Sequence, residues 1–276
     1  PVPTSVEGTT VTRVCTSGLF AITTAAASIE RGETDVAIAG GSDSTSNAEM
    51  KMPQSLMHKL APVAMSKKST WKDWAALIPQ IDPARDLLPQ RPSIRERTTG
   101  ELMGESAEKM GQRNGITREA QDAFALQSHQ RAAAAIASGR FADEIVAVDT
   151  PGGERVHADD IVRGDVSMEK LAKLRPAFAK GGTLTAANSS ALTDGASAVL
   201  LMSEERARAL GYEDLVAFRS WSYDAVDPAD QMLLGPAISM PRAAKRAGMV
   251  RPDIDLVDIH EAFAAQVLSV LKMLGS

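Results

Sequence analysis

The chain contains a single cysteine, Cys15, in a setting typical of nucleophiles. The β-branched stretch 9–14 predicts a strand, and the Ala-rich stretch 18–30 predicts a helix with apolar residues at helical spacing. Cys15 would then lie where a helix begins, and there the unpaired backbone N–H groups favour a thiolate over a thiol. The small residues that follow leave room for a carbonyl group, whose developing negative charge the Cys15 amide could stabilise. These features indicate a nucleophile, although a lone cysteine is more often a small buried apolar residue.

The next segment predicts a strand-helix-strand unit. Gly32 ends the helix, and the apolar run Asp35–Ala39 predicts a short buried strand before Gly40 and Gly41. Such units usually form right-handed parallel pairs, with reactive groups at the C-terminal ends of the strands. Cys15 would lie at such an end.

Four segments, in this order along the chain, resemble motifs of the thiolases and together extend over nearly all of it. They are Val14-Cys15-Thr16-Ser17-Gly18 with 29–32 and 35–43, Leu174-Arg175-Pro176-Ala177-Phe178, Thr185-Ala186-Ala187-Asn188-Ser189-Ser190 with 193–196, and Asp255-Leu256-Val257-Asp258-Ile259-His260-Glu261-Ala262-Phe263-Ala264. The resemblance implies an α/β chain with the thiolase-like duplicated five-layer α-β-α-β-α fold and an inserted loop domain.

The expected domain boundaries follow from shifts in composition and from this resemblance. Residues 1–44 and 193–211 would belong to the N-terminal half-domain, 45–192 to the inserted loop domain, and 212–276 to the C-terminal half-domain. The second half should repeat the plan of the first, with strands over Leu215–Phe218 and Ile254–Ile259 and helices over Pro236–Ala247 and Ala262–Leu274.

Within the loop domain, we expect helices over Glu105–Met110, Thr117–Ser138 and Met168–Leu174 and a strand over Phe141–Val148. The stretch Ser69–Ile78 could form a short amphipathic helix with Trp71, Trp74 and Ile78 on one face. This face is expected to pack within the insertion, and docking to a membrane or a partner is the alternative.

The resemblance also implies roles for individual residues. Cys15 would be the nucleophile, His260 would stabilise the enolate oxygen of the leaving acetyl-CoA, and Glu261 would position its neighbours. A buried structural histidine is the plain alternative for His260.

A second set of residues would contact the substrate. Ser190 would approach the pantetheine arm of coenzyme A, and Phe178, Met103 and Phe263 would line the same tunnel, although by residue type alone each could simply belong to the core.

The chain departs from the thiolase pattern in three ways. His260 replaces the asparagine that usually precedes Glu-Ala-Phe, a change that favours degradation of 3-ketoacyl-CoA over synthesis of acetoacetyl-CoA. The Gly-His-Pro histidine and the second cysteine are absent from the 276 residues, and only fourteen residues precede Cys15. We therefore expect an internal piece of a thiolase that is inactive and unstable on its own.

Two other functions remain open at this point. A β-ketoacyl synthase would share the fold and the nucleophile position, but it should carry two downstream histidines in other sequence settings. A non-catalytic, thiolase-like subunit that binds lipid or a partner would fit the absent motifs. The favoured function is a degradative thiolase of fatty-acid β-oxidation, which is an acyltransferase.

The composition of the chain limits the kinds of molecule that it is expected to bind. With 44% hydrophobic and 24% charged residues and a net charge of −5, the chain is typical of a soluble cytoplasmic protein that does not bind nucleic acid. It contains no apolar run long enough to span a membrane. Asp159, Asp160 and Asp165 do not match a metal-binding loop, and no permanently bound cofactor is expected, because coenzyme A is a substrate. By resemblance, the protein would be a homodimer or homotetramer with an interface near Val36–Ala39, with a β-oxidation complex subunit as a further candidate partner.

Overall fold

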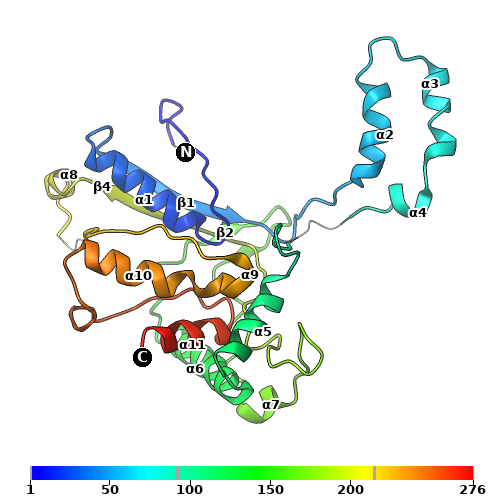
Figure 1. The fold of residues 1–276 in the computed structure, drawn as a ribbon. Helices are drawn as coiled ribbons and strands as arrows, with labels where there is room; N and C mark the ends of the chain where they lie inside the picture. The colour runs from blue at the N-terminus through cyan, green and yellow to red at the C-terminus, as the bar shows by residue number, and fades with distance from the viewer. Residues whose placement is uncertain (1, 91–93, 214–215, 276) are drawn as a thin grey trace.

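The computed structural model describes residues 2–90, 94–213 and 216–275. It shows a body of helices beside a small sheet, from which a helical arm projects (Figure 1). The sheet contains β1 (Val36–Asp43) and β4 (Gly195–Met202), and α1 (Ser17–Glu30) packs on both strands. Among these residues, no helix is long and apolar enough to cross a membrane.

The register of the sheet explains its burial pattern. Val36 is opposite Met202 and Asp43 is opposite Gly195, so the two strands are antiparallel. Because side chains alternate between the faces of a sheet, Ala39 and Leu201 share a face and are buried, whereas Ile38 and Leu200 on the other face are exposed. Gly40 is required, since an ideal Cβ atom there would lie 2.4 Å from the carbonyl oxygen of Ser197.

This pairing corrects the predicted strand-helix-strand unit. Residues 9–14 form no strand, and their surroundings show only an isolated bridge between Arg13 and Cys15. A strand needs a neighbour for its backbone hydrogen bonds, and β1 finds that neighbour in β4, about 150 residues further along the chain. The expected parallel pair is therefore wrong for this sheet.

The helices of the body surround two small clusters of buried apolar side chains. One contains Ala107, Leu184, Phe263 and Ala265, and the other contains Met110, Leu234 and Val270. They join α5 (Met103–Arg113), α11 (Ala264–Met273) and the neighbouring turns. The remaining elements of the body are α6 (Arg118–Ala137), β2 (Val148–Asp149), β3 (Arg155–Val156), α7 (Met168–Ala172), α8 (Glu204–Ala209), α9 (Pro228–Gln231), η2 (Met232–Leu234), α10 (Gly235–Arg246) and η3 (Arg251–Asp253).

Most predicted helices are confirmed, because their signals are local. The Thr117 and Ser203 side chains accept hydrogen bonds from backbone N–H groups in the first turns of α6 and α8. The predicted strand over Phe141–Val148 is wrong, since turns occupy 139–144 and only β2 pairs, with β3.

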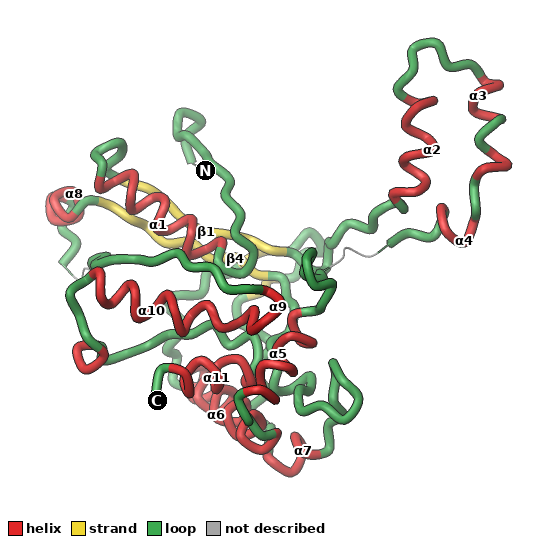
Figure 2. Tube along the Cα trace, viewed as in Figure 1, coloured by secondary structure: helices red, strands yellow, loops and turns green. Residues whose placement is uncertain are grey.

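The strands expected in the second half are also wrong for the described residues. Residues 216–218 and 254–259 are extended but unpaired (Figure 2), and Leu215 lies outside the described residues. The apolar residues there are largely exposed, such as Val216 and Leu256, because no described strand lies beside them.

The arm comprises α2 (Gln54–Ala64), α3 (Trp71–Ala75), the 3-10 helix η1 (Ile78–Gln80) and α4 (Pro83–Asp86). Lys59 Nζ lies 2.6 Å from the buried Asp86 Oδ2 and ties α2 to α4. This hydrogen bond, with others from Ser55 and the Asp82 backbone, lowers the pKa of Asp86 to about 2. The ion pair therefore persists at neutral pH.

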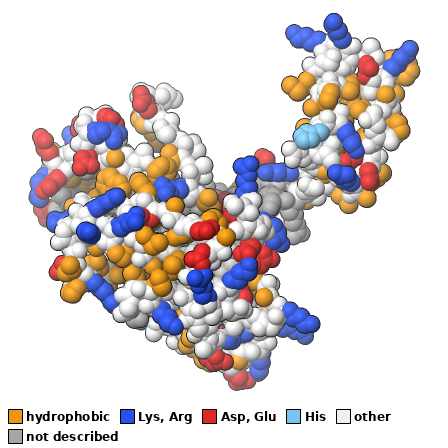
Figure 3. All heavy atoms as spheres, in the orientation of Figure 1, with side chains coloured by type: hydrophobic (Ala, Val, Ile, Leu, Met, Phe, Trp, Pro, Cys, Tyr) orange, Lys and Arg blue, Asp and Glu red, His pale blue; other side chains and the backbone are white. Residues whose placement is uncertain are grey.

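The amphipathic helix of the arm is shorter than predicted and does not bury its aromatic face. Trp71 is 74% exposed and Ile78 is 71% exposed, so the expectation that this face packs within the insertion is wrong. Figure 3 shows hydrophobic and basic side chains distributed over the arm.

Candidate active site

Cys15 occupies a tight turn directly before α1, and its side chain is exposed. Val14 has a φ angle of +50°, a left-handed conformation that β-branched residues rarely adopt. Ser17 Oγ holds the turn by accepting from the Arg13 N–H at 2.7 Å and donating to the Val14 carbonyl oxygen at 2.7 Å. The turn thus presents the sulfur to solvent at the N-terminus of a 14-residue helix.

The His260 motif lies directly before α11 and is joined to the loop that carries Ser190. The Ser190 N–H donates to the Ala262 carbonyl oxygen at 2.9 Å, and the Ala264 N–H donates to the Asn188 carbonyl oxygen at 3.0 Å. An isolated bridge between Ser189 and Phe263 lies between these two bonds. The motif and the loop therefore form one unit, although the residues are about 70 positions apart.

The two residues of this motif that were expected to have catalytic roles point to solvent. His260 and Glu261 are both exposed, and Glu261 Oε2 accepts a hydrogen bond of 2.6 Å from Ser128 Oγ on α6. No hydrogen bond within the described residues joins Cys15 to His260. In Figure 1, α1, α10 and α11 all run from the middle of the molecule towards its left side.

Met103, Phe178 and Phe263 form an apolar wall. The Phe178 and Phe263 rings meet edge to face, with centroids 5.8 Å apart, and Met103 packs on the same cluster. Gly104 makes this arrangement fit, since an ideal Cβ atom would lie 2.3 Å from the Phe178 ring. The three predicted wall residues are therefore neighbours.

Glu108 organises the loop before Ser190 and was not singled out from the sequence. Its buried carboxylate accepts hydrogen bonds from the Thr183 N–H, the Thr183 Oγ1 hydroxyl and the Leu184 N–H at 2.8–2.9 Å. The loop then folds on Asn188, whose Oδ1 accepts from the Thr185 N–H at 2.7 Å and whose Nδ2 donates to Asp122 at 2.9 Å. A glutamate on a predicted helix carries no signal of such a role, because its partners lie 75 residues away.

Replacing Glu108 by Gln should destabilise the protein by about 1–3 kcal/mol, because a buried acceptor that faces backbone N–H groups becomes in part a donor. The midpoint of urea unfolding measures this change in the intact natural protein. Glu154→Gln, at an exposed loop position, is the matched control. Equal midpoints for the two variants would show that the Glu108 carboxylate does not hold the loop.

A cavity of about 780 Å³ lies between α6, α7 and the loop 186–191. Ser190 and Glu261 line it, together with three basic side chains that sequence reasoning missed, His129, Arg163 and Lys170. Lys170 is paired with Asp165 at 2.6 Å, whereas no ion pair of Arg163 is found in the described part of the chain. These basic residues lie in unrelated stretches, so no motif could have grouped them. Neither Cys15 nor His260 lines this cavity.

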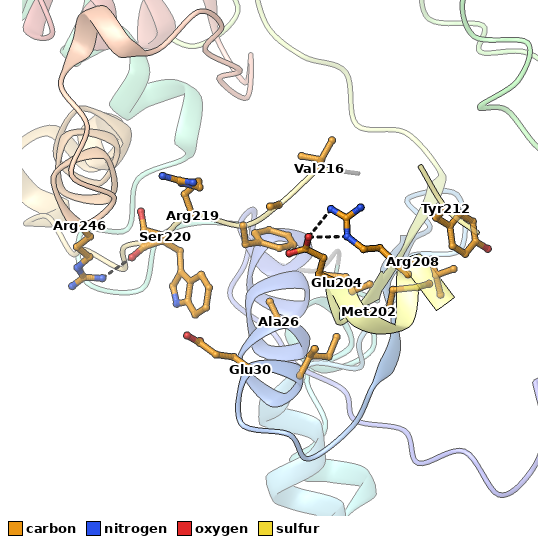
Figure 4. Close-up of a pocket in the computed structure, with 17 residues that line it drawn as sticks. Ala26, Glu30, Met202, Glu204, Arg208, Tyr212, Val216, Arg219, Ser220 and Arg246 are labelled. Atoms are coloured by element: carbon orange, nitrogen blue, oxygen red, sulfur yellow. Dashed lines mark hydrogen bonds and ion pairs between the residues drawn. The ribbon is translucent and has the colours of Figure 1, made fainter. Parts of the chain in front are cut away.

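A second cavity, of about 950 Å³, lies beside the C-terminal part of α1 (Figure 4), whereas Cys15 precedes the N-terminus of this helix. Ala26 and Glu30 of α1, Arg208 of α8 and the extended segment 216–221 line it. It contains none of the predicted site residues. Within the described ranges, no three His, Cys, Asp or Glu side chains gather in a way that could hold a metal ion.

The sequence of the chain matches two family models and many curated proteins. Residues 1–205 match the thiolase N-terminal domain and residues 212–276 match the thiolase C-terminal domain. The chain is 44% identical over 268 residues to proteins named 3-ketoacyl-CoA thiolase from Salmonella paratyphi C and Yersinia enterocolitica, covering 96% of this chain and 61% of each relative. It therefore spans about three fifths of the length of these relatives.

Solved structures agree. An acetyl-CoA acetyltransferase from Bacillus anthracis superimposes with a TM-score of 0.81 at 34% identity, covering 99% of this chain and 65% of the other. An acetyl-CoA acetyltransferase from Syntrophomonas wolfei gives 0.79 at 34% identity, covering 95% and 61%. Human mitochondrial 3-ketoacyl-CoA thiolase gives 0.76 at 29% identity, covering 95% and 62%. The α/β thiolase fold predicted from the sequence is thereby confirmed, and the chain belongs to the thiolase family.

Proposed function

We propose that the protein is a degradative thiolase, which cleaves 3-ketoacyl-CoA with coenzyme A to give acyl-CoA and acetyl-CoA. The observation that carries this proposal is the exposed Cys15 in its strained turn at the start of α1, in a chain whose relatives are named 3-ketoacyl-CoA thiolase. An exposed thiol at the N-terminal end of a helix has the chemistry of an acyl carrier.

The reaction needs two acyl transfers through sulfur. The Cys15 thiolate attacks the 3-keto carbon, a C–S bond forms, and the bond between Cα and Cβ breaks. Its electron pair leaves as the enolate of acetyl-CoA, which takes up a proton. The thiolate of coenzyme A then attacks the acyl-cysteine, releases acyl-CoA and restores the Cys15 thiolate.

His260 is assigned to the enolate oxygen, directly or through a water molecule. The His260 side chain is exposed, and the residue lies at the end of the segment 254–260, directly before Glu261. Glu261 is assigned a positioning role, which its 2.6 Å hydrogen bond with Ser128 supports by fixing the motif against α6. The two proton-transfer residues of other thiolases, in Gly-His-Pro and in the second cysteine motif, have no counterpart in these 276 residues.

Coenzyme A would lie across the cavity that Ser190 lines. Its phosphates are anionic, and Arg163, His129 and Lys170 bring basic groups to the same cavity. From there the pantetheine arm would pass Ser190 towards the wall of Met103, Phe178 and Phe263. Coenzyme A is a substrate in this proposal, and no permanently bound cofactor is invoked.

Gly104→Ala tests this path. The new methyl group would displace the Phe178 ring, so we expect KM for coenzyme A to rise about tenfold, equivalent to about 1.4 kcal/mol and within the usual cost of overpacking. Steady-state kinetics at saturating 3-ketoacyl-CoA measure the change. Gly8→Ala is the control, since a Cβ atom there would meet nothing within 4 Å. An unchanged KM would remove Phe178 from the substrate path.

The proposed activity is tested with the intact natural protein and two substrate sets. We expect coenzyme A-dependent loss of 3-ketoacyl-CoA with formation of acetyl-CoA. Condensation of acyl-carrier-protein substrates without thiolysis would indicate a β-ketoacyl synthase instead. Absence of turnover with both sets would favour the non-catalytic subunit.

The organisation of the protein is likewise proposed. We keep the divisions 1–44, 45–192, 193–211 and 212–276 as domains, with the arm inside the second. A cytoplasmic homodimer or homotetramer is proposed, with β1 near the interface, where Val36 and Ile38 are exposed. A β-oxidation complex subunit is a candidate partner, and nucleic acid is not expected.

A further inference from the structure

The turn that carries Cys15 adopts a backbone conformation that is rare for its residue types. Val14 is the one non-glycine residue with positive φ among the described residues. The hydrogen bonds that hold this conformation stay within 13–17: Thr16 Oγ1 donates to the Arg13 carbonyl oxygen at 2.8 Å, and Ser17 Oγ bridges Arg13 and Val14. They fix the shape of the turn, but they do not fix its direction relative to the rest of the site.

The Arg13 side chain supplies a connection to a distant segment. Its guanidinium carbon lies 4.7 Å from the centroid of the Tyr223 ring and 5.7 Å from that of the Phe20 ring, both within cation-π range. Phe20 belongs to the first turns of α1, whereas Tyr223 belongs to the segment before α9. Arg13 thus bridges the Cys15 turn and the region of residues 212–276 that also carries His260.

The aromatic partners are themselves held in place. Phe20 and Tyr223 meet edge to face with centroids 5.6 Å apart, and the Tyr223 hydroxyl is hydrogen-bonded to Thr23 Oγ1 on α1. No carboxylate forms a salt bridge with Arg13 in the part of the chain that the structure describes. The guanidinium is therefore placed by the two rings rather than by an ion pair.

Because Arg13 and Tyr223 are exposed, their contact should contribute little to the stability of the fold and more to the position of the Cys15 turn. Arg13 is exposed and Tyr223 is 42% exposed, and cation-π contacts at exposed sites stabilise a fold only weakly. Direction matters more for a nucleophile, because a displacement of about 1 Å can lower a rate about 10²-fold. Loss of the contact should therefore affect Cys15 chemistry far more than unfolding.

We propose that Arg13 is a positioning residue, whose guanidinium, held against the Tyr223 and Phe20 rings, directs the Cys15 turn towards the His260 side of the site. The proposal rests on the proposed thiolase function for its effect on turnover. Its effect on Cys15 reactivity does not depend on that function.

The test compares four variants of the intact natural protein. Arg13→Met and Tyr223→Leu remove the cation-π contact, whereas Arg13→Lys keeps a cation and Tyr223→Phe keeps the ring. For the first two we expect kcat for thiolysis to fall about 10- to 100-fold, with little change in KM for coenzyme A and in Tm. Arg13→Lys and Tyr223→Phe should retain most of the activity, and combining Arg13→Met with Tyr223→Leu should cost little more than either alone.

Alkylation of Cys15 by iodoacetamide is measured on the same variants. Its rate should change severalfold in Arg13→Met and Tyr223→Leu and stay near that of the natural protein in the conservative pair. If the natural protein shows no turnover, the proposed function fails, and the alkylation rates still decide the role of Arg13. Natural kcat and alkylation rates in Arg13→Met would overturn the proposal, as would losses that follow Tm equally in all four variants.

Discussion

Replacing Cys15 by Ala should abolish thiolysis, with kcat at least about 10³-fold lower, because the proposed mechanism carries the acyl group on the Cys15 sulfur between the two half-reactions. Cys15 is exposed and outside both apolar clusters, so the substitution should leave the fold intact. Activity is measured as coenzyme A-dependent loss of 3-ketoacyl-CoA, and Tm shows that the variant is folded.

The control for this variant is a neighbouring small residue. Thr16→Ser keeps the hydroxyl that donates to the Arg13 carbonyl oxygen and should retain most of the activity. A folded Cys15→Ala protein that still turns over substrate would remove Cys15 from the mechanism.

His260→Ala should lower kcat about 10²–10³-fold, the usual effect of removing one hydrogen-bond donor from a developing oxyanion. His260→Asn should retain measurable turnover, because the amide can donate to the same oxygen and asparagine is the usual thiolase residue there. His129→Ala, in the neighbouring cavity, is the comparison: it should raise KM for coenzyme A rather than lower kcat.

The two His260 variants also test whether His260 stabilises the enolate oxygen. If His260→Asn were as inactive as Cys15→Ala, His260 would do more than stabilise an oxyanion. If His260→Ala kept the natural kcat, its position before α11 would be structural.

The helices could be predicted from the sequence because their signals lie within each helix. The Thr117 side chain caps α6, and this helix begins where the predicted helix over Thr117–Ser138 begins. A strand depends on a partner elsewhere in the chain. The stretches 9–14 and 254–259 have strand composition but no described neighbour, and only β1 and β4 find each other over a long distance. Local composition could not reveal the antiparallel direction of that pair.

The candidate site was predictable to the extent that motifs carry it. Phe178 and Phe263 come from two separate motifs and Met103 from a stretch outside the motifs, and the structure brings the three together. Glu108, Arg163 and Tyr223 were missed, because each acts through residues far away in the sequence and none belongs to a recognisable pattern. Motifs in the sequence therefore led to the residues that we propose to react, but not to the residues that hold the surrounding loops in place.

Mass spectrometry of the acylated protein tests the central claim most directly. The intact natural protein is incubated with acetyl-CoA, quenched in acid and digested, and the peptide that contains Cys15 is analysed. We predict one acetyl group on Cys15, which is lost when coenzyme A is added before quenching. An acetyl group on another residue, or an unmodified Cys15 peptide under conditions of steady turnover, would contradict the account.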